Sequence, residues 1–173
     1  DYSKIKKQLS EIDTYMKTSV EYGKGIRILN QDLWETIISF IISANNNIPR
    51  IKGIIERLSE KYGDEIKYKG NKYYTFPTPE QLKNVTVEEY RKLGLGFRDI
   101  RLYETTKMIL NKQVDIENMK NNPNTIEVRE ELLKLSGVGP KVADSFLLFS
   151  DLIRFAVFRI AVRVRRVDND LYL

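Results

Sequence analysis

The sequence contains no cysteine and no histidine among its 173 residues. Without cysteine there is no disulfide framework and no thiolate metal ligand, and without histidine the other common ligand of zinc is missing. Cys–His and Ser–His catalysis also need an imidazole base. Metal-centred hydrolysis and imidazole-assisted nucleophilic catalysis are therefore disfavoured as function classes.

The chain also lacks an apolar run long enough to span a membrane, and it shows no signal-peptide pattern. Its composition is otherwise that of a globular protein, with 42% hydrophobic and 31% charged residues. This length can bury a real core, as one domain or as two closely packed helical lobes. The net charge of +5 suits a partner that carries phosphate groups without proving one. We expect a cytoplasmic protein without membrane contact.

Residues 131–149 have the pattern of one helix end, a tight turn and the start of a second helix. Gly137 suits the end of the first helix because glycine tolerates positive φ, and Pro140 suits the first turn of the next. The turn Gly137-Val138-Gly139 lets a ligand approach the backbone closely, and exposed N–H groups at a helix N-terminus bind phosphate. The pattern indicates either a grip for a nucleic-acid backbone or an ordinary helix corner with a glycine cap.

Lys141 follows this turn at the start of the second predicted helix. The positive end of the helix dipole and apolar neighbours both disfavour its ammonium, and the uncharged amine is the nucleophilic form. The alternative is a solvated lysine that adds one positive charge to a DNA-binding face. The spacing alone favours the solvated lysine.

Three stretches together resemble one enzyme family. Leu132–Asp144 looks like the helix–hairpin–helix of the lysine-bearing base-excision DNA glycosylases. Ser39–Ile51, with three consecutive asparagines, and Lys92–Arg98 narrow the resemblance to the 8-oxoguanine DNA glycosylase/AP lyases. The similarity runs from about Arg27 to Phe149. It implies an all-α fold, a helical helix–hairpin–helix glycosylase core, and a DNA repair activity that excises oxidised guanine from duplex DNA.

The resemblance also assigns roles to single residues. In the family a lysine attacks the sugar carbon C1′, forms a Schiff base and then cleaves the strand by β-elimination, and this role falls on Lys141. Four family residues fill the space left by the flipped base, and they correspond to Asn45, Arg50, Phe97 and Arg98. Without the resemblance, the run of asparagines would indicate only a well-capped connection between helices.

The implied partner is duplex DNA, gripped by the backbone of Gly137, Val138 and Gly139. The family has no organic cofactor. It holds a structural monovalent cation on three backbone carbonyls, which correspond to Leu133, Leu135 and Val138.

Local patterns place the remaining elements. Helical spacing or capping residues predict helices over 3–18, from Asp32 to the asparagines, over 48–62, after Thr78, after Thr86 and over 99–111. Residues 63–77 break this spacing and predict a short β-hairpin-like insertion. Its tyrosines either stack on bases or belong to an exposed turn that packs on the core.

The resemblance breaks after Phe149. Ala161 stands at the position of a family aspartate that caps a helix, positions the substrate and handles protons, and Arg159 stands where the family has proline. We expect one catalytic core over residues 1–173, without the family's N-terminal β domain and last helices. Glycosylase activity should be weak or absent, and we favour an engineered, truncated chain.

Residues 153–168 carry five arginines between aliphatic residues. This segment is a solvated amphipathic helix, an additional phosphate contact, or a surface redesigned for inactivation or for self-association. In the last case the chain is an engineered, non-enzymatic scaffold that forms a homo-oligomer.

Overall fold

The computed structural model describes residues 2–27, 29–150 and 152. Within these residues the helices are α1 (Tyr2–Ser10), α2 (Thr14–Tyr22), α3 (Leu33–Ser43), α4 (Ile48–Tyr62), α5 (Val87–Lys92), α6 (Asp99–Leu110), α7 (Ile116–Asn121), α8 (Thr125–Leu133) and α9 (Pro140–Phe149). Two short strands, β1 (Glu65–Tyr68) and β2 (Asn71–Tyr74), and a 3-10 turn, η1 (Gly96–Arg98), complete the described elements. The all-α fold class with a hairpin insertion is confirmed.

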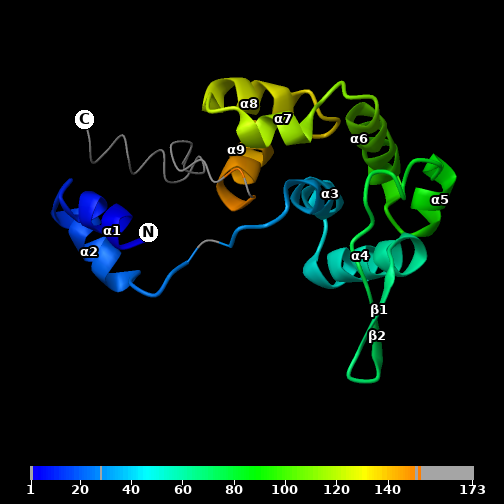
Figure 1. The fold of residues 1–173 in the computed structure, drawn as a ribbon, viewed down its shortest axis with the longest axis horizontal. Helices are drawn as coiled ribbons and strands as arrows, with labels where there is room; N and C mark the ends of the chain where they lie inside the picture. The colour runs from blue at the N-terminus through cyan, green and yellow to red at the C-terminus, as the bar shows by residue number, and fades with distance from the viewer. Residues whose placement is uncertain (1, 28, 151, 153–173) are drawn as a thin grey trace.

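Helix α3 lies at the centre of the helical body, between α4 and α9 (Figure 1). It is apolar on most of its surface, and seven of its residues are buried. Phe40 of α3 meets Phe146 of α9 edge to face, with ring centroids 5.3 Å apart. The indole N–H of Trp34 donates to the Pro77 carbonyl at 2.8 Å, so its one polar atom is satisfied. Helix α3 thereby fixes the segments from which the site is built.

Side-chain caps set the predicted helix starts. Asp32 accepts a hydrogen bond from the Glu35 N–H and begins α3, and Asn47 accepts from the Arg50 N–H and begins α4. Thr86 begins α5 with a reciprocal capping box. The predictions for these starts, and for α6, are confirmed.

Two helix predictions are wrong. The single helix expected over 3–18 is two helices. The backbone of Asp13 is extended, and its carboxylate accepts a hydrogen bond from the Met16 N–H at 2.7 Å, so Asp13 caps the start of α2. The residues after Thr78 form turns rather than a helix, since their bonds Lys83 N–H to Glu80 O and Val85 N–H to Leu82 O span three residues.

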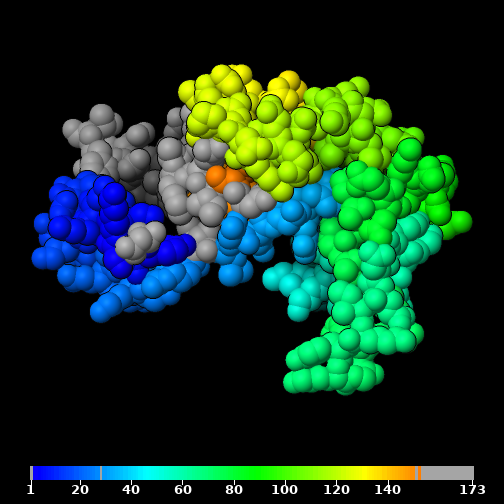
Figure 2. Space-filling model, viewed as in Figure 1, coloured from blue at the N-terminus to red at the C-terminus, as the bar shows by residue number. Residues whose placement is uncertain are grey.

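The insertion is an antiparallel hairpin of β1 and β2 in which Ile66 pairs with Tyr73. Lys69 and Gly70 form its two-residue turn with positive φ at both positions. The hairpin stands out from the body (Figure 2), and Tyr68 and Tyr73 are exposed. The hairpin prediction is confirmed, while base stacking by these tyrosines stays a prediction.

No helix in the described part of the chain has the length and apolar character to cross a membrane. The cytoplasmic location stays a prediction. Residues 153–168, with their five arginines, and Ala161 lie outside the described residues.

Candidate functional site

The predicted site residues lie at three helix junctions. Asn45 and Arg50 belong to the α3–α4 junction, Phe97 and Arg98 to the α5–α6 junction, and residues 133–141 to the α8–α9 junction. The structure joins the first two junctions by hydrogen bonds between side chains and backbone. The third meets them through α6.

Arg98 is the residue that joins the first two junctions. It is only 2% exposed, and its guanidinium donates to three backbone carbonyls: Ala44 (2.7 Å), Asn45 (2.6 Å) and Leu95 (3.0 Å). Burial, and then the neighbouring charges of Arg50 and Arg101, lower the pKa of Arg98. In this structure Arg98 holds the asparagine loop, and contact with a base edge would require these bonds to be exchanged.

Two more arginines hold the turn before Phe97. Arg57 donates twice to the Leu93 carbonyl, from Nε at 3.0 Å and Nη2 at 2.7 Å. Arg50 donates from Nη2 to the Gly94 carbonyl at 2.9 Å. With the bond from Arg98 to Leu95, the carbonyls of three consecutive residues each bind a different guanidinium. We call residues Arg50, Arg57 and Arg98 with these carbonyls the arginine cradle.

The three asparagines have different partners. The Asn46 amide donates to the Ile42 carbonyl at 3.0 Å and Asn47 caps α4, so both act within the helix–helix connection. The exposed side chain of Asn45 has no hydrogen-bond partner among the described residues, and its φ of 49° lies in the left-handed region. Of the three, Asn45 therefore has an amide free for a base edge.

Phe97 is 56% exposed at the end of the cradle. The guanidinium carbon of Arg98 lies 4.3 Å from the ring centroid, and that of Arg101 lies 5.5 Å away. Cations at these distances attract the ring face and steady the side chain. A large exposed ring held in this way can stack on a nucleobase.

The α8–α9 hairpin needs glycine at its first position for two reasons. Gly137 has φ of 80°, and a Cβ there would lie 2.6 Å from Cδ of Arg101. Gly139, the N-cap of α9, has φ of −95° and open space around an added Cβ. No side chain caps α9, and the Val142 N–H donates to the Gly139 carbonyl at 3.0 Å. The backbone N–H groups of Gly139 and Lys141 have no acceptor among the described residues and are available to an anion.

Lys141 lies exposed on the first turn of α9. Asp144, one helical turn further along, is buried and forms an ion pair with Arg129 of α8, with Nε and Oδ1 2.6 Å apart. Lys141 itself forms no ion pair with a residue that the structure describes. The pair between Arg129 and Asp144 thus joins the two hairpin helices and leaves the Lys141 amine free.

The carbonyls predicted to hold a cation fit that task in part. Leu135 O accepts from the Val138 N–H at 3.1 Å, whereas the carbonyls of Leu133 and Val138 accept no hydrogen bond from described residues. Unbonded carbonyl oxygens in one turn are hard donors of the type that alkali and alkaline-earth cations take. Leu133, Leu135 and Val138 would hold the cation, which would stiffen the turn.

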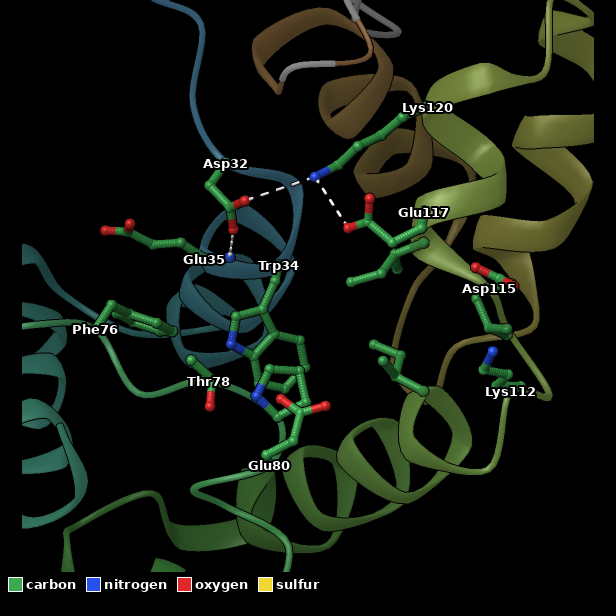
Figure 3. Close-up of a pocket in the computed structure, with 14 residues that line it drawn as sticks. Asp32, Trp34, Glu35, Phe76, Thr78, Glu80, Lys112, Asp115, Glu117 and Lys120 are labelled. Atoms are coloured by element: carbon green, nitrogen blue, oxygen red, sulfur yellow. Dashed lines mark hydrogen bonds and ion pairs between the residues drawn. The ribbon is translucent and has the colours of Figure 1, made fainter.

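A cavity of about 570 Å³ lies elsewhere in the described residues. Figure 3 shows it between Trp34 of α3, the segment around Thr78 and the residues near α7, with Lys120 between Asp32 and Glu117. None of the predicted site residues lines it. Its size therefore does not place the site, which rests on the three junctions.

Sequence analysis missed Arg57, Arg101 and Arg129 as contributors. Arg50 and Arg57 are seven residues apart and share one face of α4, which is the only local signal. Their partners lie 36 to 44 residues away along the chain. No local sequence pattern predicts hydrogen bonds between residues so far apart in the chain.

A helical body that presents a glycine hairpin, an uncapped helix start and a lysine beside it defines a helix–hairpin–helix protein. The model of the HhH-GPD superfamily base excision DNA repair proteins matches residues 38–169, and that of the 8-oxoguanine DNA glycosylase N-terminal domain matches residues 1–37. The chain belongs to the HhH-GPD superfamily of base excision DNA repair proteins.

Similar proteins point in the same direction. The apo 8-oxoguanine glycosylase/lyase of Clostridium acetobutylicum is 45% identical with a TM-score of 0.87, over 99% of this chain and 59% of that one. The same enzyme bound to double-stranded DNA, with cytosine opposite 8-oxoguanine, is 44% identical with a TM-score of 0.84, over 100% and 59%. The N-glycosylase/DNA lyase of Saccharomyces cerevisiae is 36% identical over 86% of this chain and 42% of its own length. The chain thus spans about half the length of these relatives.

Proposed function

We propose that the protein binds duplex DNA and acts as a glycosylase/AP lyase on oxidised guanine. The observation that carries the proposal is Lys141, which lies exposed on the first turn of α9 beside Gly139 and forms no ion pair with any residue that the structure describes. The 45% sequence identity to the 8-oxoguanine glycosylase/lyase of Clostridium acetobutylicum supports oxidised guanine as the substrate.

The reaction assigns each junction a task. The α9 N-terminus and the hairpin backbone hold a phosphate beside the lesion. Phe97 stacks in the space left by the flipped base, and the Asn45 amide meets the opposite base. The arginine cradle, which includes Arg50, keeps the Phe97 ring and the Asn45 amide in place.

The chemical steps fall on Lys141. Its uncharged amine attacks C1′, forms the N–C1′ bond and breaks the glycosidic bond, so the base leaves with the bonding electron pair and takes up a proton. The nitrogen loses a proton, its lone pair forms the C=N bond of the Schiff base as the C1′–O4′ bond breaks, and O4′ keeps the bonding pair and takes up a proton. Removal of a C2′ proton then breaks the C3′–O bond, and the 3′ phosphate leaves by β-elimination.

We propose that Ala161 weakens the first of these steps. A positioned carboxylate contributes about 10²–10⁴-fold in proton-transfer steps. An abasic site has already lost its base, so strand cleavage there depends less on this group. The chain should therefore process abasic DNA better than 8-oxoguanine.

Borohydride trapping on an abasic duplex tests the assignment. Lys141→Gln should abolish the covalent adduct and leave binding largely intact, because the hairpin backbone is kept. Lys17→Gln, on the exposed surface of α2, is the matched control and should trap like the parent. An equal adduct yield in Lys141→Gln would show that another amine reacts.

The non-enzymatic alternative has its own measurement. If residues 153–168 mediate self-association, size-exclusion chromatography with light scattering should give a multiple of the 20.3 kDa chain mass. A monomer that forms the Lys141 adduct would remove the scaffold interpretation and its homo-oligomer, and would support residues 1–173 as one catalytic core.

A further inference from the structure

Arg101 lies between the Phe97 ring and the α8–α9 hairpin. It belongs to the first turn of α6, and its side-chain stem packs where a Cβ of Gly137 would be, 2.6 Å from Cδ. Its guanidinium carbon is 5.5 Å from the Phe97 ring centroid. Arg101 therefore connects two parts of the site that are forty residues apart in sequence.

The guanidinium of Arg101 lacks the partners that its neighbours have. Arg50, Arg57 and Arg98 donate to backbone carbonyls, and Arg91 pairs with Asp99 at 2.7 Å. Within residues 2–27, 29–150 and 152, no acceptor binds Arg101, although the side chain is partly buried. A guanidinium carries five donors, and those of Arg101 are not buried, so an anion from solvent can reach them.

Arg101 lies close to another arginine, Arg98. Arg50 and Arg101 are the two charges that act on Arg98. Asp99 pairs with Arg91 and Asp144 with Arg129. The carboxylate of Glu104, one turn further along α6, accepts a hydrogen bond from the Ser136 hydroxyl at 2.5 Å. No carboxylate of the described residues forms an ion pair with the guanidinium of Arg101.

We infer that Arg101 is a DNA-contact and positioning residue whose guanidinium takes a backbone phosphate between the Phe97 wedge and the hairpin. The planar fork of arginine matches two phosphate oxygens, which lysine does not. The stem of the same side chain supports Gly137 and the Phe97 ring. This inference rests on the proposed function, because it assumes that duplex DNA is the ligand.

The phosphate contact is tested by salt-dependent binding to a duplex with a stable abasic analogue. Arg101→Met keeps the stem and removes the charge. We expect about tenfold weaker binding at physiological salt. The slope of log affinity against log salt should fall by about 0.9, the value of one phosphate contact. Lys17→Met on α2 removes an equal charge far from the site and should keep the parent slope.

The stem is tested by separating affinity from rate. At saturating protein, Arg101→Ala should slow formation of the Lys141 adduct by about tenfold or more, because the hairpin loses its support. Arg101→Met should slow it by less than Arg101→Ala while sharing its weaker binding. If Arg101 only stabilised the fold, the binding affinity and the rate of adduct formation would both fall in parallel with the free energy of unfolding.

The outcomes separate this inference from the proposed function. An Arg101→Met slope equal to that of the parent overturns the phosphate contact, and a trapped parent adduct would leave the proposed function standing. A parent that binds duplex but forms no adduct counts against the proposed function, while the salt test of Arg101 still applies. A parent that does not bind DNA overturns both.

Discussion

The arginine cradle and the α8–α9 hairpin use their polar groups in opposite ways. In the cradle, the carbonyls of Leu93, Gly94 and Leu95 each bind a guanidinium. In the hairpin, α9 has no side-chain cap, and the Lys141 amine forms no ion pair with described residues. The cradle therefore fixes a shape, whereas the hairpin keeps its donors for a ligand. Substitutions in the first should act on stability, and those in the second on binding.

The two regions share one electrostatic device. Each has a buried aspartate close to the site, and an arginine neutralises it: Arg91 for Asp99 and Arg129 for Asp144. The desolvated carboxylates are thereby compensated within the fold. Because these two carboxylates are already neutralised, they do not weaken the attraction of the other cations near the site for phosphate.

The largest expected effect is on the cradle. Arg98→Met should lower the free energy of unfolding by about 3 kcal/mol, because three carbonyls lose charged donors. Urea unfolding followed by circular dichroism measures this. Arg101→Met, which breaks no hydrogen bond of the described residues, should change stability by less than about 0.5 kcal/mol. Equal losses in the two variants would contradict the contrast between the regions.

The next effect concerns Ala161, which stands where the family resemblance predicts an aspartate. Ala161→Asp should raise residual excision of 8-oxoguanine by about 10²-fold, since a positioned carboxylate restores a proton acceptor and electrostatic support for charge on the sugar. Ala161→Asp combined with Arg159→Pro tests whether the preceding turn limits the gain. Single-turnover cleavage of 8-oxoguanine and abasic duplexes measures both. No change on either substrate would show that the carboxylate does not limit this chain.

The two hairpin glycines provide a sharper comparison within one turn. Gly137→Ala should cost about 2 kcal/mol of stability, because its φ is positive and the new Cβ meets Arg101. Gly139→Ala should cost less than about 0.5 kcal/mol, since its φ is ordinary and its surroundings are open. Gly139→Ala should nevertheless weaken DNA binding if phosphate approaches this backbone. Full affinity in that variant would argue against the backbone grip.

The smallest effect at neutral pH comes from an unpaired group beside the cradle. The Tyr90 hydroxyl is buried without a partner among the described residues, and its neighbour Thr106 donates to Leu102 O at 2.8 Å. Tyr90→Phe should therefore change stability at pH 7 by less than about 0.5 kcal/mol.

Tyr90 should matter at alkaline pH. Burial raises the pKa of Tyr90 to about 12, while an unfolded tyrosine titrates near pH ~10. The raised pKa means that its contribution is fully present below pH ~10 and is lost as the pH rises toward 12. Tyr90→Phe avoids this loss, so its stability relative to the parent should increase between pH 9 and 11 in urea titrations. A constant difference would show that the hydroxyl ionises freely in the fold.

Local chemistry let the sequence predict much of the fold. Asp32, Asn47 and Thr86 begin their helices through side-chain bonds to N–H groups three residues on, and these residue types are the ones that favour helix caps. Gly137 and Pro140 likewise predict the hairpin, because glycine tolerates the positive φ at a helix end and proline suits the first turn of the next helix. The break at Asp13 was missed because the apolar stripe continues across it.

By itself the sequence determined where α3, α4, α5 and α6 begin and where the glycine hairpin lies. Only the tertiary structure decided how the arginines act. Arg98, predicted to face DNA, is directed inward because carbonyls 53 and 54 residues away lie within its reach. Arg101, which no motif marks, lies against Gly137, and no acceptor within residues 2–27, 29–150 and 152 binds its guanidinium. A long flexible arginine side chain has no local preference for pointing inward or toward solvent, so the packing of distant segments around it decides its direction.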